Sequence, residues 1–235
     1  MKHSEFYRVG FHDTDASGNM SAAAALRYMQ ETAYLHLHKY GPTPKELTDS
    51  GRGFILSRIA LSFYSPLRAY EEFEVQTWTC ESKGYSFLRC YRILREGVIV
   101  AEGSSVWALM DFERRRPVRV DDFSYNFEDD EPLDLDVPKS IKLPETTRLV
   151  GEHTVSYSDA DTNGHMTNTR YPELICNFLP DMKGKRVSNL AINFLGEAPI
   201  ETTLKVYFAK YDDVSYIRTL RPDGTKNIEA EVILD

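Results

Sequence analysis

The sequence DADTNGHMTN, residues 159–168, places a carboxylate, an amide and an imidazole at alternate positions, namely Asp161, Asn163 and His165. If this stretch is extended, the three side chains project to the same side, because side chains alternate along a strand. Gly164 allows the backbone to bend or a ligand to approach closely. A helix predicted to follow directly presents free N–H groups at its start, which can stabilise an oxyanion. This group of residues is suited to acyl-transfer chemistry.

A near-copy of this stretch, DTDASGNMS at residues 13–21, lacks the reactive side chains. Ser17 and Asn19 stand in the places of the amide and the imidazole, and Pro66 aligns with a second acidic residue, Glu197. Turn chemistry explains the aspartates and glycines of both copies. It does not explain why an imidazole and Glu197 occur together in only one of them. We therefore predict that one copy holds a site and the other keeps only the scaffold.

The duplication extends beyond these two stretches, since residues 57–75 align with 188–206 and residues 86–89 align with 215–218. The order of the matching blocks and their polarity pattern are the same in both halves, which is the mark of an internal repeat. Each unit reads as a short strand, the polar stretch, a helix and then several strands. The sequence therefore predicts an α+β fold made of two equivalent units.

The local pattern places the elements of each unit. Strands leading into the two polar stretches are expected at residues 6–13 and 153–159. A helix is predicted over about residues 21–40, ended by Gly41 and Pro42. The second helix carries an apolar stripe at i, i+3, i+4 and i+7, and Thr167 or Asn168 can cap its start. Strands with period-two character are expected at residues 55–63, 73–81, 86–94, 98–110, 188–195, 203–211, 215–220 and 227–234.

The composition narrows the classes of function. The chain has 235 residues, 42% of them hydrophobic, which suits a globular protein with one or two cores. The net charge is −8, and residues 121–136 hold eight acidic residues and no lysine or arginine, so a nucleic-acid partner is not expected. No apolar run is long enough to span a membrane, and the first residues lack the apolar core of a signal peptide. We expect a cytoplasmic protein.

Metal and thiol chemistry find little support in the sequence. The three cysteines, Cys80, Cys90 and Cys176, include no pair at C-x-x-C spacing, so free thiols are expected. A Cys176–His165 nucleophile pair is conceivable, but the apolar neighbours of this cysteine favour a packed side chain. There is neither a glycine-rich phosphate loop nor a zinc-spaced set of cysteine and histidine, and no cofactor or metal is expected.

The stretch DADTNGHMTNTRY (159–171) resembles the D-x-D-x-N-x-H-x-x-N motif of acyl-acyl carrier protein (acyl-ACP) thioesterases, the enzymes that release fatty acids in plants and bacteria. SVWALMDFERRRPVRV (105–120) is similar to their W-x-x-M…R-R sequence. The resemblance covers nearly the whole chain. It implies two tandem hot-dog domains, each a long helix wrapped by an antiparallel sheet, that form an internal pseudo-dimer.

The resemblance also implies boundaries and roles. An N-terminal hot-dog domain of residues 1–116 would supply the acyl pocket, with Trp78 and Trp107 among its candidate walls. Residues 117–148 would form an acidic, proline-rich linker, read as solvated, and residues 149–235 the catalytic domain. The catalytic positions match Asp161, Asn163, His165 and Glu197.

The chemistry implied by the resemblance is hydrolysis of fatty acyl-ACP thioesters, with acyl carrier protein as partner, no nucleic acid or membrane, and a monomer or homodimer. Family members often carry a cysteine after the glutamate, whereas this chain has Ala198, which argues against a thiol nucleophile. Glu197 is then the base for water or the group that orients it. Asp161 is either the nucleophile or a second carboxylate, and Asn163 and His165 position these groups and polarise the carbonyl.

Three other readings stay open from the sequence. They are a thioesterase acting on acyl-coenzyme A, a hot-dog dehydratase or hydratase, and a non-catalytic acyl-binding module. A dehydratase or hydratase needs no second carboxylate, so the presence of Glu197 argues against that reading. A module that had lost catalysis would be expected to carry residues like those of the first unit, and the second unit does not. A thiol-release assay with acyl-ACP and acyl-coenzyme A distinguishes these alternatives.

Overall fold

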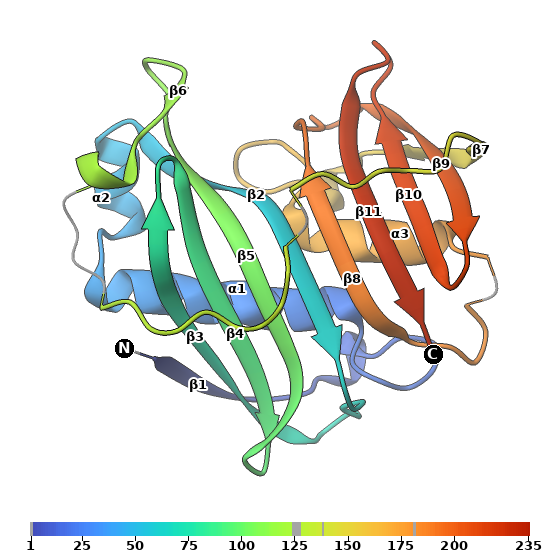
Figure 1. Ribbon diagram of the computed structural model, residues 1–235, viewed down its shortest axis with the longest axis horizontal. Coiled ribbons are helices and arrows are strands. Elements are labelled where there is room, and N and C mark those ends of the chain that lie inside the picture. The colour runs from blue at the N-terminus through green and yellow to red at the C-terminus, as the bar shows by residue number, and fades with distance from the viewer. Residues whose placement is uncertain (1, 124–127, 138, 181) are drawn as a thin grey trace.

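The computed structural model describes residues 2–123, 128–137, 139–180 and 182–235, which form one broad antiparallel sheet with helices against one face (Figure 1). In this described part the sheet has 11 strands in the order β1-β3-β4-β5-β2-β8-β11-β10-β9-β7, with the short β6 paired to β5. The strands are β1 (His3–Arg8), β2 (Arg52–Phe63), β3 (Glu72–Lys83), β4 (Ser86–Arg95), β5 (Val98–Asp111), β6 (Arg116–Pro117), β7 (Arg148–Thr154), β8 (Val187–Phe194), β9 (Thr203–Tyr211), β10 (Val214–Leu220) and β11 (Lys226–Leu234).

The sheet consists of two equivalent halves that meet at its centre. Outward from β2 the first unit gives β5, β4, β3 and β1, and outward from β8 the second gives β11, β10, β9 and β7. β2 and β8 pair antiparallel, with Ile59 opposite Ile192 and Leu61 opposite Leu190. Equivalent strands thus hold equivalent places, as the sequence repeat predicts.

The first unit places one long helix across its half of the sheet (Figure 1). α1 (Ala22–Tyr40) agrees with the predicted helix of residues 21–40. The hydroxyl oxygen of Ser21 accepts a hydrogen bond from the N–H of Ala24 at 3.1 Å, which caps the helix start. A short helix, α2 (Pro44–Asp49), follows it.

The helix of the second unit, α3 (Tyr171–Phe178), is shorter than α1. A 3-10 turn, η4 (Asn168–Arg170), precedes it, and the expected side-chain cap at this start is not formed. Leu179 takes an extended conformation at the other end, because the next residue is Pro180 and a residue before proline is disfavoured in the helical region. The second unit therefore offers less helical surface than the first.

The main core lies between the helices and the sheet. Leu26 and Met29 of α1, Ile175 of α3, and Leu61 and Ile192 of the two central strands are fully buried in one cluster. Burying each such side chain contributes roughly 1.5–3 kcal/mol. Since this cluster draws on both helices and on β2 and β8, the two units are packed as one body.

The strands that lead into the two polar stretches end sooner than predicted. In place of strands over residues 6–13 and 153–159, β1 and β7 give way to 3-10 turns, η1 (Phe11–Asp13) and η3 (Tyr157–Asp159). The carboxylate of the last residue of each turn accepts a hydrogen bond from the backbone N–H three residues earlier, at 3.3 Å in η1 and 2.9 Å in η3. Local side-chain bonds of this kind compete with a strand ladder.

The segment between β6 and β7 crosses the face of the sheet opposite to the helices (Figure 1). The indole N–H of Trp78 donates to the backbone oxygen of Glu131 at 2.9 Å. Leu133 packs against the cluster that contains Trp78 and Cys80, and Ile141 is 3% exposed. The segment is therefore partly packed rather than fully solvated. Trp78, expected among the walls of an acyl pocket, lies on the other face of the sheet.

Candidate functional site

The polar stretch of the second unit forms a tight turn, so the extended arrangement considered from the sequence does not apply, and the bend that Gly164 allows is present. The N–H of Gly164 donates to the oxygen of Asp161 at 3.0 Å, and the N–H of Asp161 donates to the oxygen of His165 at 2.9 Å. Gly164 has a φ of 76°, in the left-handed region that favours glycine. The carboxylate of Asp161 also accepts a bond from the N–H of Asn163 at 2.8 Å. The turn, rather than strand alternation, gathers these side chains.

The loop that begins with this turn pairs with the segment after β8. The N–H of Met166 donates to the oxygen of Ala198 at 2.8 Å, and the N–H of Ile200 donates to the oxygen of Gly164 at 3.1 Å. An isolated bridge joins His165 to Pro199. This pairing fixes the position of Glu197, the residue before Ala198, relative to the loop.

The imidazole of His165 and the carboxylate of Glu197 face each other across this pairing. The distance from Nδ1 of His165 to Oε2 of Glu197 is 3.4 Å, and both side chains reach solvent, with exposed fractions of 33% and 61%. The guanidinium of Arg221 donates to the backbone oxygen of Glu197 at 3.4 Å. The structure thus brings together two residues that lie 32 positions apart in the sequence.

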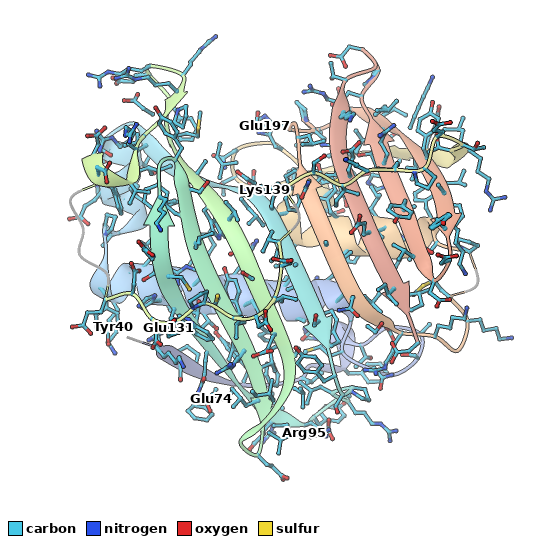
Figure 2. All side chains as sticks on the ribbon, in the orientation of Figure 1. Tyr40, Glu74, Arg95, Glu131, Lys139 and Glu197 are labelled. Atoms are coloured by element: carbon cyan, nitrogen blue, oxygen red, sulfur yellow. The ribbon has the colours of Figure 1, made fainter. Side chains whose placement is uncertain are left out.

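Asp161 and Asn163 form a second couple beside the first. The amide nitrogen of Asn163 lies 3.4 Å from the second carboxylate oxygen of Asp161. Among the described residues, the hydrogen bonds and ion pairs join the side chain of Asp161 to Asn163, and that of His165 to Glu197. All four predicted residues therefore lie on one short loop and its partner segment, as two adjacent pairs. Figure 2 labels Glu197 at the edge of the second unit that faces the first.

The helix of the first unit reaches this loop. The side chain of Tyr34 on α1 is half exposed; its partial burial raises its pKa, and the negative charge of Asp161 raises this pKa further. Asp161 belongs to the second unit, so its carboxylate lies near the helix of the other one. The loop of the candidate site therefore lies near α1 of the first unit, which also packs against η4 and α3 of the second.

Tyr34 also lines a cavity of about 140 Å³ between α1 and the sheet of the first unit. One face of α1 contributes four residues at i, i+3, i+4 and i+7, which are Gln30, Ala33, Tyr34 and Leu37. The strands and the segment after β6 contribute the rest: Phe54, Thr79, Ser82, Phe87, Leu88, Arg89, Trp107, Val120, Phe123 and Asp129. Trp107, unlike Trp78, is thus a wall of the cavity as the sequence predicted.

Several of these wall residues were missed by the sequence reading. Tyr34, Gln30 and Arg89 were assigned no role, although Phe87, Arg89 and Tyr91 alternate along one strand and must share its inner face. That alternation is the signal that could have found a charged residue among core positions. The helix residues fall at a spacing that indicates a common face, but nothing in the sequence says that a cavity lies against it.

The equivalent loop of the first unit has the same backbone and different side chains. Gly18 has the same φ of 76°, and the N–H of Gly18 donates to the oxygen of Asp15 at 2.9 Å. Here the amide of Asn19 donates to the hydroxyl of Ser17 at 2.9 Å, and this hydroxyl donates to the Asp15 carboxylate. A cavity of about 290 Å³ adjoins this loop, but no imidazole lines it. The scaffold is retained without the pair of imidazole and carboxylate.

Cys176 is not a second reactive centre, and the described residues form no metal centre. Burial raises the pKa of Cys176 to about 11, so this thiol stays protonated at neutral pH and is a poor nucleophile. All three cysteines are free, as expected. In the part of the chain that the structure describes, no three His, Cys, Asp or Glu side chains are arranged to hold a metal ion. No helix of that part combines the length and apolar character needed to cross a lipid bilayer.

Comparison with known proteins agrees with the architecture. A family model described as the acyl-ACP thioesterase N-terminal domain matches residues 1–126. A palmitoyl-acyl carrier protein thioesterase of Cuphea hookeriana, described as chloroplastic, is 23% identical over 220 residues, which cover 85% of this chain and 52% of that protein. A Gossypium hirsutum protein of the same description is 23% identical over 224 residues. The chain therefore spans about half the length of the curated relatives it matches.

Solved structures show the fold. The crystal structure of an acyl-ACP thioesterase from Bacteroides thetaiotaomicron superposes with a TM-score of 0.92 at 21% identity, covering 100% of this chain and 98% of that one. A 12:0-ACP thioesterase from Umbellularia californica gives a TM-score of 0.82 at 17% identity, covering 100% and 97%. The predicted fold class, two tandem hot-dog domains forming an internal pseudo-dimer, is confirmed.

Proposed function

The chain belongs to the acyl-ACP thioesterase family, and from this premise we propose that it hydrolyses fatty acyl-ACP thioesters to free fatty acid and carrier-protein thiol. The observation that carries the proposal is the contact of the His165 imidazole with the Glu197 carboxylate, 3.4 Å apart, on the same loop as the couple of Asp161 and Asn163. The first unit repeats the loop without this set. The fold alone would not support a catalytic role. The presence of the imidazole, the amide and Glu197 in the second unit, and their absence from the equivalent positions of the first unit, does support it.

The reaction makes modest demands on the protein. Water attacks the thioester carbonyl carbon and loses a proton, the C–S bond breaks, and the thiolate takes up a proton afterwards. A thiol has a pKa of about 8.5, so it leaves readily and needs little help from a general acid. The protein must therefore activate water and stabilise the tetrahedral oxyanion.

We assign Glu197 to the activation of water, either as the base that takes its proton or as the group that orients it. His165 lies within reach of this carboxylate, and together with the amide of Asn163 it positions the reacting groups and polarises the carbonyl. Asp161 serves either as direct nucleophile or as the second carboxylate of the site. The absence of a thiol after Glu197, where Ala198 is fully buried, favours carboxylate chemistry in this chain.

The acyl chain has a place in the first unit. Tyr34 connects the two parts, because it lines the cavity of that unit and lies close enough to Asp161 for the carboxylate charge to act on it. We propose that the chain enters beside Tyr34 and lies against the cavity face of α1. The first unit then contains the substrate while the second performs the chemistry.

The remaining expectations stay proposals. We divide the chain into an N-terminal domain of residues 1–116, a linker of residues 117–148 and a catalytic domain of residues 149–235. The end of β6 at Pro117 and the start of β7 at Arg148 support this division. We propose acyl carrier protein as the partner. A cytoplasmic location and a monomeric or homodimeric state stay predictions.

The test is release of free thiol from acyl-ACP and from acyl-coenzyme A carrying the same fatty acyl chain. We expect release from acyl-ACP with a kcat/KM well above that for acyl-coenzyme A. Thiol release from acyl-coenzyme A and not from acyl-ACP would show that the substrate is a coenzyme A thioester. Binding of acyl chains without any release would favour the acyl-binding module, and neither binding nor release would refute the proposal.

A further inference from the structure

The cavity of the first unit is not a purely apolar pocket, because a buried cation lies on its wall. Arg89 of β4 is 9% exposed and points inward among apolar neighbours. Its Nη1 group donates to Nδ1 of His36 at 3.0 Å and to the hydroxyl of Thr77 at 3.1 Å. Both partners are neutral: burial, and then the Arg89 charge, lower the pKa of His36 to about 3. The cation thus has neutral partners only.

The other edge of the Arg89 guanidinium, Nε and Nη2, makes no side-chain hydrogen bond within the part of the chain that the structure describes. Among the described residues, none accepts a hydrogen bond from Nε or Nη2, and no carboxylate forms an ion pair with Arg89. Asp129 is the acidic residue on the cavity wall, and no ion pair joins it to this arginine within the same described part. Burying a charge without a counter-charge is costly, and arginine stays protonated in proteins. A buried cation on a cavity wall that has no carboxylate partner among the described residues can bind an anion.

Two further polar atoms on the same wall are also unsatisfied. Nε2 of Gln30 and the hydroxyl oxygen of Thr79 are buried and have no hydrogen-bond partner among the described residues. Both residues line the cavity together with Arg89. The amide N–H₂ and the hydroxyl can donate, as the guanidinium does. Buried polar groups are normally paired, so donors gathered on one cavity wall indicate an acceptor that binds there.

The sheet order places two of these donors, Arg89 and Thr79, on the strands of the cavity wall that lie furthest from the candidate site. β8 leads to Glu197, and moving away from it the sheet continues through β2 and β5, which carries Trp107, to β4 with Arg89 and β3 with Thr79. An acyl chain that enters from the Asp161 loop would therefore bring its tail, and not its thioester, toward Arg89.

We propose that this protein prefers acyl chains whose far end carries a carboxylate, that is, thioesters of dicarboxylic acids. The carboxylate binds the free Nε/Nη2 edge of Arg89 through two parallel hydrogen bonds, the geometry in which a guanidinium grips a carboxylate. Gln30 and Thr79 donate to its remaining lone pairs. This inference rests on the proposed thioesterase function and specifies its substrate class.

The experiment compares two acyl-ACP series of matched chain length, one ending in a methyl group and one in a carboxylate, by thiol release. For the wild-type protein we expect a higher kcat/KM with the carboxylate-ended chain at one or more lengths. A preference for the methyl-ended chain at every length would overturn the proposal and leave thioester hydrolysis standing. No release from either series would instead refute the hydrolase function itself.

Variants separate binding of the tail from a structural role of the arginine. Arg89→Met should lower kcat/KM for the carboxylate-ended chain by roughly 10- to 100-fold, the size expected for hydrogen bonds to a charged group, and should leave or raise that for the methyl-ended chain. Gln30→Leu, which breaks no described hydrogen bond, should shift the ratio in the same direction by less. Arg92→Met, on the same strand but paired with Glu102 on the other face, is the matched control. Equal losses for both substrates in Arg89→Met and no shift in Gln30→Leu would overturn the proposal.

Discussion

Nδ1 of His165 lies 3.4 Å from Oε2 of Glu197, although the two residues belong to different segments of the second unit. Backbone pairing holds them together, because the strand-like bridge from His165 to Pro199 and the bond from Met166 to Ala198 fix both segments. In the first unit Asn19 and Arg68 form the equivalent bridge. The backbone device is common to both units, and only the second uses it to pair an imidazole with a carboxylate.

Glu197→Gln should lower kcat/KM for acyl-ACP by about 10²–10⁴-fold, the usual effect of removing a general base. The melting temperature should stay near that of the wild-type protein, because the side chain is 61% exposed. Glu152→Gln, an exposed change on β7, is the control and should be silent. A Glu197→Gln protein with wild-type turnover would remove this carboxylate from the mechanism.

A single turnover in ¹⁸O-labelled water can identify Asp161 as the nucleophile when the resulting anhydride is hydrolysed at its aspartyl carbonyl. Label in the fatty acid fits attack of water on the thioester and equally on the acyl carbonyl of such an anhydride. We expect the label in the released fatty acid, since both carboxylate oxygens are engaged by Asn163, at 2.8 and 3.4 Å, which makes direct attack by this carboxylate less favourable than attack by water. Label in the protein and not in the first equivalent of product would identify Asp161 as the nucleophile. Mass spectrometry of both species locates the label. Asp161→Ala should lose several orders of magnitude in rate on either route.

Asn19→Ala tests whether the first unit is silent in catalysis. Among the described residues its amide bonds only to Ser17, within an exposed loop, so we expect kcat within about twofold of wild type and a stability change within about 0.5 kcal/mol, as for most surface substitutions. Steady-state kinetics and thermal unfolding check both. A folded variant with collapsed turnover would show that the first loop takes part in the chemistry.

The fold was largely predictable because repetition and periodicity are properties of the chain itself. Strands with alternating residues, such as β9 and β10, were placed within one residue of their ends. The leading strands were misplaced, since Asp13 and Asp159 close 3-10 turns through their own carboxylates. A local hydrogen bond that ends a strand leaves no trace in hydrophobic periodicity.

The site was predictable in its membership and not in its geometry. The unequal copies identified His165 and Glu197 as a pair, but they did not show that Gly164 makes a tight turn around which the side chains gather. The cavity could not be predicted from the sequence, because it depends on how α1 packs against strands that lie far along the chain. Trp78 and Trp107 look alike in sequence, and only the register of β3 and β5 puts them on opposite faces of the sheet.

Ala33→Phe should shorten the acyl chains that the enzyme accepts. Ala33 lies on the cavity face of α1 and is 9% exposed, so a ring added there fills space that the acyl chain is proposed to occupy. We expect kcat/KM to fall for the longest chains used by the wild-type enzyme and to hold for shorter ones. Overpacking should cost about 1–3 kcal/mol of stability. A uniform loss across chain lengths would place the acyl chain elsewhere.

The last prediction concerns acid stability and a contact between the units. Asp13 is 6% exposed, and its carboxylate accepts hydrogen bonds from Tyr28 at 2.7 Å and Arg27 at 3.2 Å, while Arg27 also pairs with Glu173 of the second unit at 2.9 Å. Burial acts to raise the pKa of Asp13, but the bonds from Tyr28 and Arg27 outweigh it and hold this pKa below its ordinary value. A carboxyl group with a lowered folded-state pKa stabilises the fold above its unfolded pKa of about 3.9, and this contribution is lost as the pH falls through the folded-state value.

Asp13→Asn should therefore reduce the free energy of unfolding by about 1–3 kcal/mol at pH 7, the effect expected when hydrogen bonds to a charged group are weakened. The difference from wild type should shrink below pH 4, where the wild-type carboxyl group also becomes protonated. Urea unfolding of both proteins at several pH values measures this convergence. Asp15→Asn, an exposed change in the same loop, is the control and should show a smaller difference. A gap between Asp13→Asn and wild type that is independent of pH would mean that the Asp13 charge contributes nothing, and that the loss comes from altered packing.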